Sequence, residues 1–375
     1  MSSLFGKIAC IKASRDPESS PILDFERLAA NQRKEILTQL IPDTNVIINM
    51  TRASDANEPA EDRTLQKYGL LEIVQFLRRC SDLRLTYYFS PFFSISEMPS
   101  AEAASSVLAL NLFSQKFGLN WTDAHPEIVP DLSIIGRPRK GYMGLELDER
   151  RWLAVPYSAL LLMLFVARDF ADCAPIVKFR RYLRLYRRIV NIVSLREIAV
   201  AAFVFAPIPG EDEEIYPTWD RIVRNFTGRK KLSVKFPTKP SQMDRVALNG
   251  AHDTTLLNVA NYGDAKGIDG DMLDTWVVTG DLKLHALTEV VHHTGFGTRD
   301  VGLGLVLKNF SSFGSYWREA HEEINALGRA FRWGLKTNPD EQVRRALNVI
   351  ALSELGYENA EPYSRRHSLS HREAS

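Results

Sequence analysis

Four segments that set one acidic residue beside a short apolar run constrain the fold of this chain more than any other feature. The segments are Leu40–Ile48, Phe89–Glu97, His252–Ala260 and Thr275–Leu284, and their acids are Asp43, Glu97, Asp253 and Asp281. Each acid stands where a predicted strand ends or a predicted helix begins. Stretches with helical spacing, such as Leu65–Cys80, lie between them. This alternation predicts an α/β fold.

The same patterns predict individual elements. We expect a helix at Phe25–Leu40, strands at Leu40–Ile48 and Leu83–Phe89, and a helix over residues 101–118. Glu149–Ala206 is typical of nearly continuous helix, broken near Ala174-Pro175 and Val193-Ser194. Asp253 is expected to begin a helix, and two more helices are predicted over residues 315–334 and 339–354.

The four acids predict a metal site. In an open α/β sheet, functional sites form in the crevice beyond the carboxyl ends of the strands. Four carboxylates in one crevice would repel one another, and Mg²⁺ or Mn²⁺ would relieve that repulsion because hard cations prefer carboxylate oxygens.

Four short motifs carry a family resemblance. They are Asp43-Thr44-Asn45 beside an apolar strand, Ser94-Ile95-Ser96-Glu97, Asp253 before Leu256-Leu257, and Val278-Thr279-Gly280-Asp281. In this order the motifs resemble those of the PIN-domain nucleases, metal-dependent ribonucleases that include many bacterial toxins. The resemblance covers roughly residues 38–120 and 245–310.

The resemblance implies a PIN-like three-layer sandwich with a central, mainly parallel sheet, and a metal-dependent endonuclease that cleaves RNA rather than DNA. Asp43, Glu97, Asp253 and Asp281 would be catalytic and hold Mg or Mn, while Asn45 and Thr279 would orient ligands or water. A toxin or defence role, with an inhibitory or regulatory protein partner, would be in keeping with this family.

The chain departs from the family pattern between its second and third motifs. Glu97 and Asp253 lie 156 positions apart (253 minus 97), so we expect a mainly helical insertion at 125–245. It would divide the PIN-like domain into 1–124 and 246–358, followed by a disordered tail at 359–375. The identity of the third acidic ligand stays open, since Asp264, Asp269, Asp271 and Asp274 are alternatives to Asp253.

Each acid also has a purely structural interpretation. Asp43 and Asp281 could stabilise turns, Asp253 could cap a helix, and Ser94 with Glu97 could form a capping box. If so, the chain would be a non-catalytic module that binds nucleic acid or protein.

Two basic segments could contact phosphates. On a predicted helix at Lys178–Arg188, one face carries Arg180, Arg181, Arg184, Arg187 and Arg188. Arg221–Met243 contains seven cations and no acid, among them Arg229, Lys230 and Lys231, and Phe226 and Phe236 could stack on bases. A solvated helix face and a disordered basic loop are the alternatives.

Composition restricts how the protein could bind nucleic acid and where in the cell it could work. The chain has 47 Lys and Arg against 46 Asp and Glu, so nucleic-acid binding would depend on local patches. Three scattered cysteines fit a reducing compartment. The most apolar run, Leu153–Ala167, is shorter than the roughly 20 residues of a membrane span, so we expect a buried helix and a cytoplasmic protein.

Overall fold

A computed structural model describes residues 3–14, 21–98, 100–119, 121, 141–192, 194–229, 236–267, 271–294, 304–330 and 338–356. The chain forms two compact units, each built from two stretches of sequence. The first comprises residues 1–139 and 256–306, and the second comprises residues 140–255 and 307–375.

The first unit is built on a five-stranded sheet with the order β1-β2-β5-β3-β4. Its strands are β1 (Ser3–Phe5), β2 (Ile8–Ile11), β5 (Met272–Thr279), β3 (Ile36–Pro42) and β4 (Tyr88–Phe89). β3 is parallel to both β4 and β5, whereas β2 is antiparallel to β1 and β5. The predicted α/β class is therefore confirmed. The sheet is mixed and not mainly parallel, because an N-terminal hairpin adds two antiparallel strands.

Helices cover both faces of this sheet. Leu40, Trp276 and Val278 share one core with helices that follow β3 and β4 in the sequence. These helices are α2 (Thr44–Ala53), α3 (Asp62–Lys67), α4 (Leu71–Asp82), α5 (Phe92–Ser96) and α6 (Ser100–Lys116). On the other face, Gly263 of α11 (Pro240–Lys266) lies against Thr275 and Gln39. α12 (Leu282–Val290) packs against β2. α1 (Phe25–Arg33) packs against β3, and its Leu28 belongs to the first core, with Leu40 and Trp276.

Several predicted boundaries in this unit are wrong. The predicted helix from Phe25 ends at Arg33, and the chain then enters β3 through Glu35, which has a positive φ of 56°. β3 ends at Pro42, so the apolar run Val46–Ile48 belongs to helix α2 and not to a strand. The predicted strand from Leu83 is reduced to Tyr88–Phe89, because Arg84 turns the chain with a φ of 56°.

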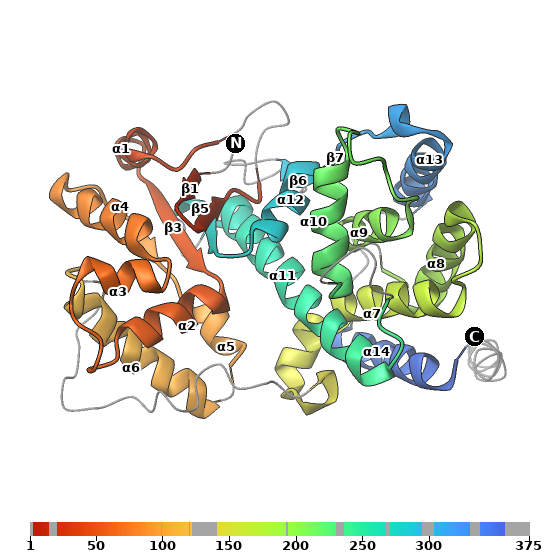
Figure 1. The fold of residues 1–375 in the computed structure, drawn as a ribbon, viewed down its shortest axis with the longest axis horizontal. Helices are drawn as coiled ribbons and strands as arrows, with labels where there is room; N and C mark the ends of the chain where they lie inside the picture. The colour runs from red at the N-terminus through yellow and green to blue at the C-terminus, as the bar shows by residue number, and fades with distance from the viewer. Residues whose placement is uncertain are drawn as a thin grey trace. The chain divides into compact units, whose positions relative to one another are not determined.

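The described part of the second unit is almost entirely helical (Figure 1). Its helices are α7 (Leu147–Asp169), α8 (Pro175–Ile189), α9 (Leu195–Phe205), α10 (Tyr216–Thr227), the first part of α11, α13 (Ser315–Ala330) and α14 (Pro339–Leu355). Ala174 and Ser194 precede α8 and α9, which confirms the two predicted breaks. The terminal helices α13 and α14, assigned from sequence to the PIN-like domain, lie in this unit instead, because α14 packs along α7. A short second sheet, which pairs β6 (Val291–Thr294) with β7 (Gly304–Leu307), belongs to the first unit apart from Leu307.

Helix α7 contains the most apolar run of the sequence. Among the described residues, it is the one helix long and apolar enough to span a membrane by length and composition. Within its most apolar window of 18 residues, 78% of the positions are buried inside the structure, as in the core helix of a globular protein.

Candidate carboxylate site

Asp43 directly follows the carboxyl end of β3, the strand between β5 and β4. Its backbone N–H donates to the carbonyl of Val278 at 2.8 Å, which ties the end of β3 to β5. The side chain is 8% exposed and accepts hydrogen bonds from Thr279 Oγ1 at 2.7 Å and from the backbone N–H of Asn45 at 3.2 Å. Asp43 therefore caps helix α2 and also faces the neighbouring strand.

Asp281 lies just beyond the end of that neighbouring strand. Its backbone N–H donates to Thr279 Oγ1 at 2.9 Å, and its carboxylate caps α12 by accepting from the backbone N–H of Lys283 at 2.8 Å. One hydroxyl group, that of Thr279, thus connects the Asp43 side chain to the Asp281 backbone.

Glu97 reaches the same region from helix α5. The segment that leads to it follows the end of β3, since Ser90 N–H donates to the Leu40 carbonyl at 2.8 Å and the Ser94 hydroxyl donates to the Pro42 carbonyl. Thr44 Oγ1 donates to the Glu97 carboxylate at 2.6 Å. The capping-box interpretation is wrong, because Ser94 lies inside α5, whose N-cap is Pro91.

Glu97 and Asp281 are close enough to affect the ionisation of Asp43. Burial raises the pKa of Asp43 above its usual range, and the charges of Glu97 and Asp281 raise it further, against the opposing hydrogen bonds from Thr279 and Asn45. Carboxylate oxygens are the donors that Mg²⁺ and Mn²⁺ prefer. As they stand, however, no three His, Cys, Asp or Glu side chains in the described ranges are gathered tightly enough to hold a metal ion. The donor chemistry fits a hard cation, whereas coordination would require the carboxylates to turn toward one another.

Asp253 is placed differently from the other three acids. It lies inside α11, which begins at Pro240, so the predicted helix start is wrong. It belongs to the second unit, where its carboxylate accepts a hydrogen bond from Asn225 Nδ2 at 3.1 Å. The long helix was not recognised in the sequence, because Gly250 interrupts its helical pattern of apolar residues. A Cβ at Gly250 would come within 2.9 Å of both Leu160 and Phe226, so glycine allows close packing there.

The competing acids Asp264 and Asp274 have other partners. Lys12 Nζ contacts Asp264 at 2.6 Å and Asp274 at 2.8 Å, and Arg27 Nε contacts Asp274 at 2.6 Å. Asp274 is paired with Thr38 in the middle of the sheet, seven residues before Asp281, or about 23 Å at the rise of a strand. Asp271 directly precedes β5, also far from the carboxyl ends, and Asp269 lies outside the described residues.

The predicted basic face of α8 is only partly available. Arg180 forms ion pairs with Glu323 at 2.7 Å and Glu319 at 3.0 Å, and the Arg181 guanidinium lies 4.0 Å from the ring centroid of Phe170. The arginines at positions 184, 187 and 188 are exposed.

In the second basic segment, Arg221–Met243, some of the side chains predicted to bind nucleic acid are also occupied by other contacts. Arg229 lies over the ring of Phe236 at 4.8 Å, and Phe226 is buried, so it cannot stack on a base. Lys230 and Lys231 lie outside the described residues.

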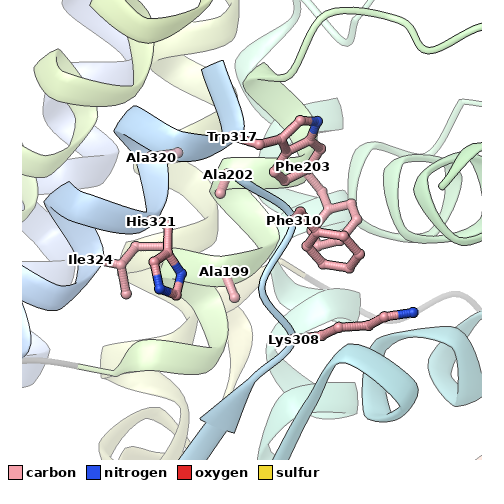
Figure 2. Close-up of a pocket in the computed structure, with 9 residues that line it drawn as sticks. All are labelled: Ala199, Ala202, Phe203, Lys308, Phe310, Trp317, Ala320, His321 and Ile324. Atoms are coloured by element: carbon pink, nitrogen blue, oxygen red, sulfur yellow. The ribbon is translucent and has the colours of Figure 1, made fainter. Parts of the chain in front are cut away.

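The second unit also contains a small apolar pocket that the sequence did not predict (Figure 2). Its lining comes from α9, α13 and the chain before α13, namely Ala199, Ala202, Phe203, Lys308, Phe310, Trp317, Ala320, His321 and Ile324. No acid lies among these residues, so the pocket does not resemble the carboxylate site.

Sequence reasoning missed the role of Thr44. The residue stands in the Asp43-Thr44-Asn45 motif, and a hydroxyl next to an acid is a signal for a residue that orients carboxylates.

Comparison of the chain with protein-family models, curated proteins and solved structures finds no match. Function must therefore be inferred from the geometry of the carboxylate site.

Proposed function

We propose that the chain is a metal-dependent phosphodiester hydrolase of PIN-like type, acting on RNA. One observation carries this proposal. Asp43, Glu97 and Asp281 come from three distant parts of the sequence, yet all lie at the carboxyl ends of β3 and β5 or beside them, close enough to raise the pKa of Asp43. Structural capping alone would not require a buried acid to face two others.

The residues around the acids would hold them for this task. Thr279 fixes the Asp43 carboxylate and the start of α12 together, and Thr44 fixes Glu97. The Asn45 amide, 3.5 Å from the Asp43 carboxylate, is exposed and available to orient water or a phosphate oxygen. A bound Mg²⁺ or Mn²⁺ would lower the pKa of water and stabilise charge on the scissile phosphate.

The test is hydrolysis by the full-length protein. Single-stranded RNA and the small phosphodiester bis(p-nitrophenyl) phosphate should both be hydrolysed with Mg²⁺ or Mn²⁺ but not with EDTA. Asp43→Asn should lower the rate by at least about 100-fold, because even a residue that only orients a metal ligand contributes 10- to 100-fold. Asp271→Asn, an exposed acid before β5, is the matched control and should keep full activity. Metal-dependent cleavage that survives in Asp43→Asn would refute the proposal.

A non-catalytic binding module is the second candidate. Asp43 and Asp281 both cap helices, and the acids are not gathered around a common ion as they stand. This candidate predicts that the protein binds nucleic acid or a partner protein without hydrolysing either phosphodiester substrate in any divalent metal.

A further inference from the structure

Lys283 places a positive charge directly beside the carboxylate site. Its backbone N–H donates to the Asp281 carboxylate at 2.8 Å, so the Lys283 Cα lies roughly 4 Å from that carboxylate oxygen. The side chain is exposed, and within the described residues it forms no ion pair. A positive side chain that stands next to an acidic site without pairing with its acids is available to hold an anion.

The position of Lys283 in α12 does not favour the stability of that helix. Lys283 belongs to the first turn, where the helix macrodipole places partial positive charge, and no acid follows the Asp281 N-cap in this turn. Cations stabilise the last turn of a helix and not the first. Helix capping therefore does not explain this lysine, and a solvated surface residue is the alternative interpretation.

The Lys283 side chain can reach the space beside the acids. Side chains of a helix lean toward its N-terminus, which in α12 is the end that carries Asp281. A lysine side chain is flexible and about 6 Å long when extended. An anion next to Asp281 therefore lies within reach of the ammonium group. Thr279 connects Asp281 to the Asp43 carboxylate, so such an anion would be at the site proposed for hydrolysis.

We infer that Lys283 binds a non-bridging oxygen of the phosphate that is hydrolysed. This inference rests on the proposed function and adds to it a residue that holds the substrate. A phosphodiester carries a negative charge, which the carboxylates would repel, and a lysine ammonium offsets this repulsion as a compact point charge. Because the contact is with the phosphate itself, a phosphodiester without base or sugar should need it too.

The first test compares Lys283→Met, which removes the charge, and Lys283→Arg, which keeps it, with Lys34→Met. Lys34 is the matched control, because it is an exposed lysine of the same unit that precedes β3, whereas Asp43 follows the end of that strand. The seven residues of β3 span about 23 Å. KM and kcat are measured separately for bis(p-nitrophenyl) phosphate with Mn²⁺.

Lys283→Met should raise KM about 10-fold, because hydrogen bonds between charged groups contribute at least this much. Its kcat should change little, since the bound substrate and the transition state make the same contact. Lys283→Arg and Lys34→Met should keep a KM close to that of the wild type. In urea, Lys283→Met should unfold no earlier than the wild type, which separates lost binding from lost folding.

A second measurement does not depend on hydrolysis. Lysines of the wild type are acetylated with sulfo-N-hydroxysuccinimide acetate in the presence of Mg²⁺ and analysed by mass spectrometry. Dimethyl phosphate is compared with sodium chloride at the same ionic strength. Dimethyl phosphate should slow the acetylation of Lys283 and leave that of Lys34 unchanged, because a bound phosphate covers the ammonium group.

Either of two results would overturn the role of Lys283: a KM within twofold of the wild type in Lys283→Met, or equal acetylation of Lys283 with and without dimethyl phosphate. Failure of the proposed function looks different. In that case the wild type would hydrolyse no small phosphodiester in any metal, and the acetylation of Lys283 alone would decide whether it binds phosphate.

Discussion

Thr279 shows how a single side chain can hold a site together. Its hydroxyl donates to the Asp43 carboxylate and accepts from the Asp281 backbone N–H, so it contacts the residues at the ends of both parallel strands. The group is fully buried, and water cannot replace it.

Thr279→Val keeps the shape of the side chain but removes both hydrogen bonds. It should cost about 1–3 kcal/mol in free energy of unfolding, because buried partners are left unsatisfied, and lower hydrolysis by about 10- to 100-fold. Thr51→Val is the control. Thr51 Oγ1 is buried and has no hydrogen-bond partner among the described residues, so this variant should be stabilised by up to about 1 kcal/mol. Equal effects of both variants in urea unfolding would contradict the role of Thr279.

The ionisation of Asp43 should appear in the pH dependence of stability. Its pKa in the folded protein is raised above 3.8, so its contribution to stability is complete below that value and is lost as pH rises through the folded pKa. Asp43→Asn cannot ionise. Relative to the wild type, it should therefore gain stability between pH 4 and pH 7, as measured by urea unfolding. A stability difference between the two proteins that stays constant across this range would show that the ionisation of Asp43 does not destabilise the fold.

At the residue scale, an acid after an apolar strand marks the carboxyl end of that strand, and Asp43 and Asp281 do lie just beyond β3 and β5. That Asp43, Glu97 and Asp281 hold one metal ion stays a prediction. Asp253 could not be judged in the same way. Its place depends on where α11 begins, and the helical pattern alone did not reveal a start 13 residues earlier at Pro240.

At the scale of elements, a buried ion network joins β2, α1 and β5. Lys12 follows β2, Arg27 lies on α1, and both contact Asp274 inside β5. Asn31 Nδ2 and Trp276 Nε1 also donate to this carboxylate, at 2.6 Å and 3.1 Å. Neither Lys12 nor Arg27 stands out in the sequence, because long-range pairs leave no local pattern.

Asp274→Asn should destabilise the protein by about 3–5 kcal/mol at pH 7, because it removes the counter-charge of Arg27 and one of the two counter-charges of Lys12. Burial alone would raise the pKa of Asp274, but Lys12 and Arg27 hold it well below its usual range. Its contribution to stability is therefore complete above 3.8 and is lost as pH falls through the folded pKa. The wild type should thus lose its advantage over the variant only below about pH 4. Asp271→Asn, exposed before β5, should show neither effect in urea unfolding.

Element types were easier to predict than their boundaries. The amphipathic helix α8 leaves a clear period, and Pro175 and Ser194 mark the starts of α8 and α9. α7 is recognised by its long apolar run. The end of β3 was misplaced because Val46–Ile48 is apolar enough for a strand, while the Asp43 cap makes it a helix. The N-terminal hairpin was missed because strands of three and four residues carry too little pattern.

At the scale of the whole molecule, charge is nearly balanced but unevenly distributed. The net charge is +1, and the carboxylate site in the first unit is acidic. A nucleic acid would thus need cations elsewhere, and α8 in the second unit carries several exposed arginines. The ion pairs of Arg180 remove it from this set, which the sequence could not show because Glu319 and Glu323 lie more than 130 positions away.

The double variant Arg184→Glu and Arg188→Glu tests whether this face holds phosphates. Both side chains are exposed on α8, so the change should leave the core intact. If each contacts a phosphate, affinity for single-stranded RNA should fall, and the slope of log affinity against log salt should flatten by about 0.7 per lost contact. Hydrolysis of bis(p-nitrophenyl) phosphate should stay unchanged, because the acids proposed to carry it lie in the first unit. Arg63→Glu with Arg79→Glu, two exposed arginines on α3 and α4, is the matched control for net charge. An equal loss of affinity in both double variants would mean that RNA responds to total charge, and the α8 face would then have no specific part in binding.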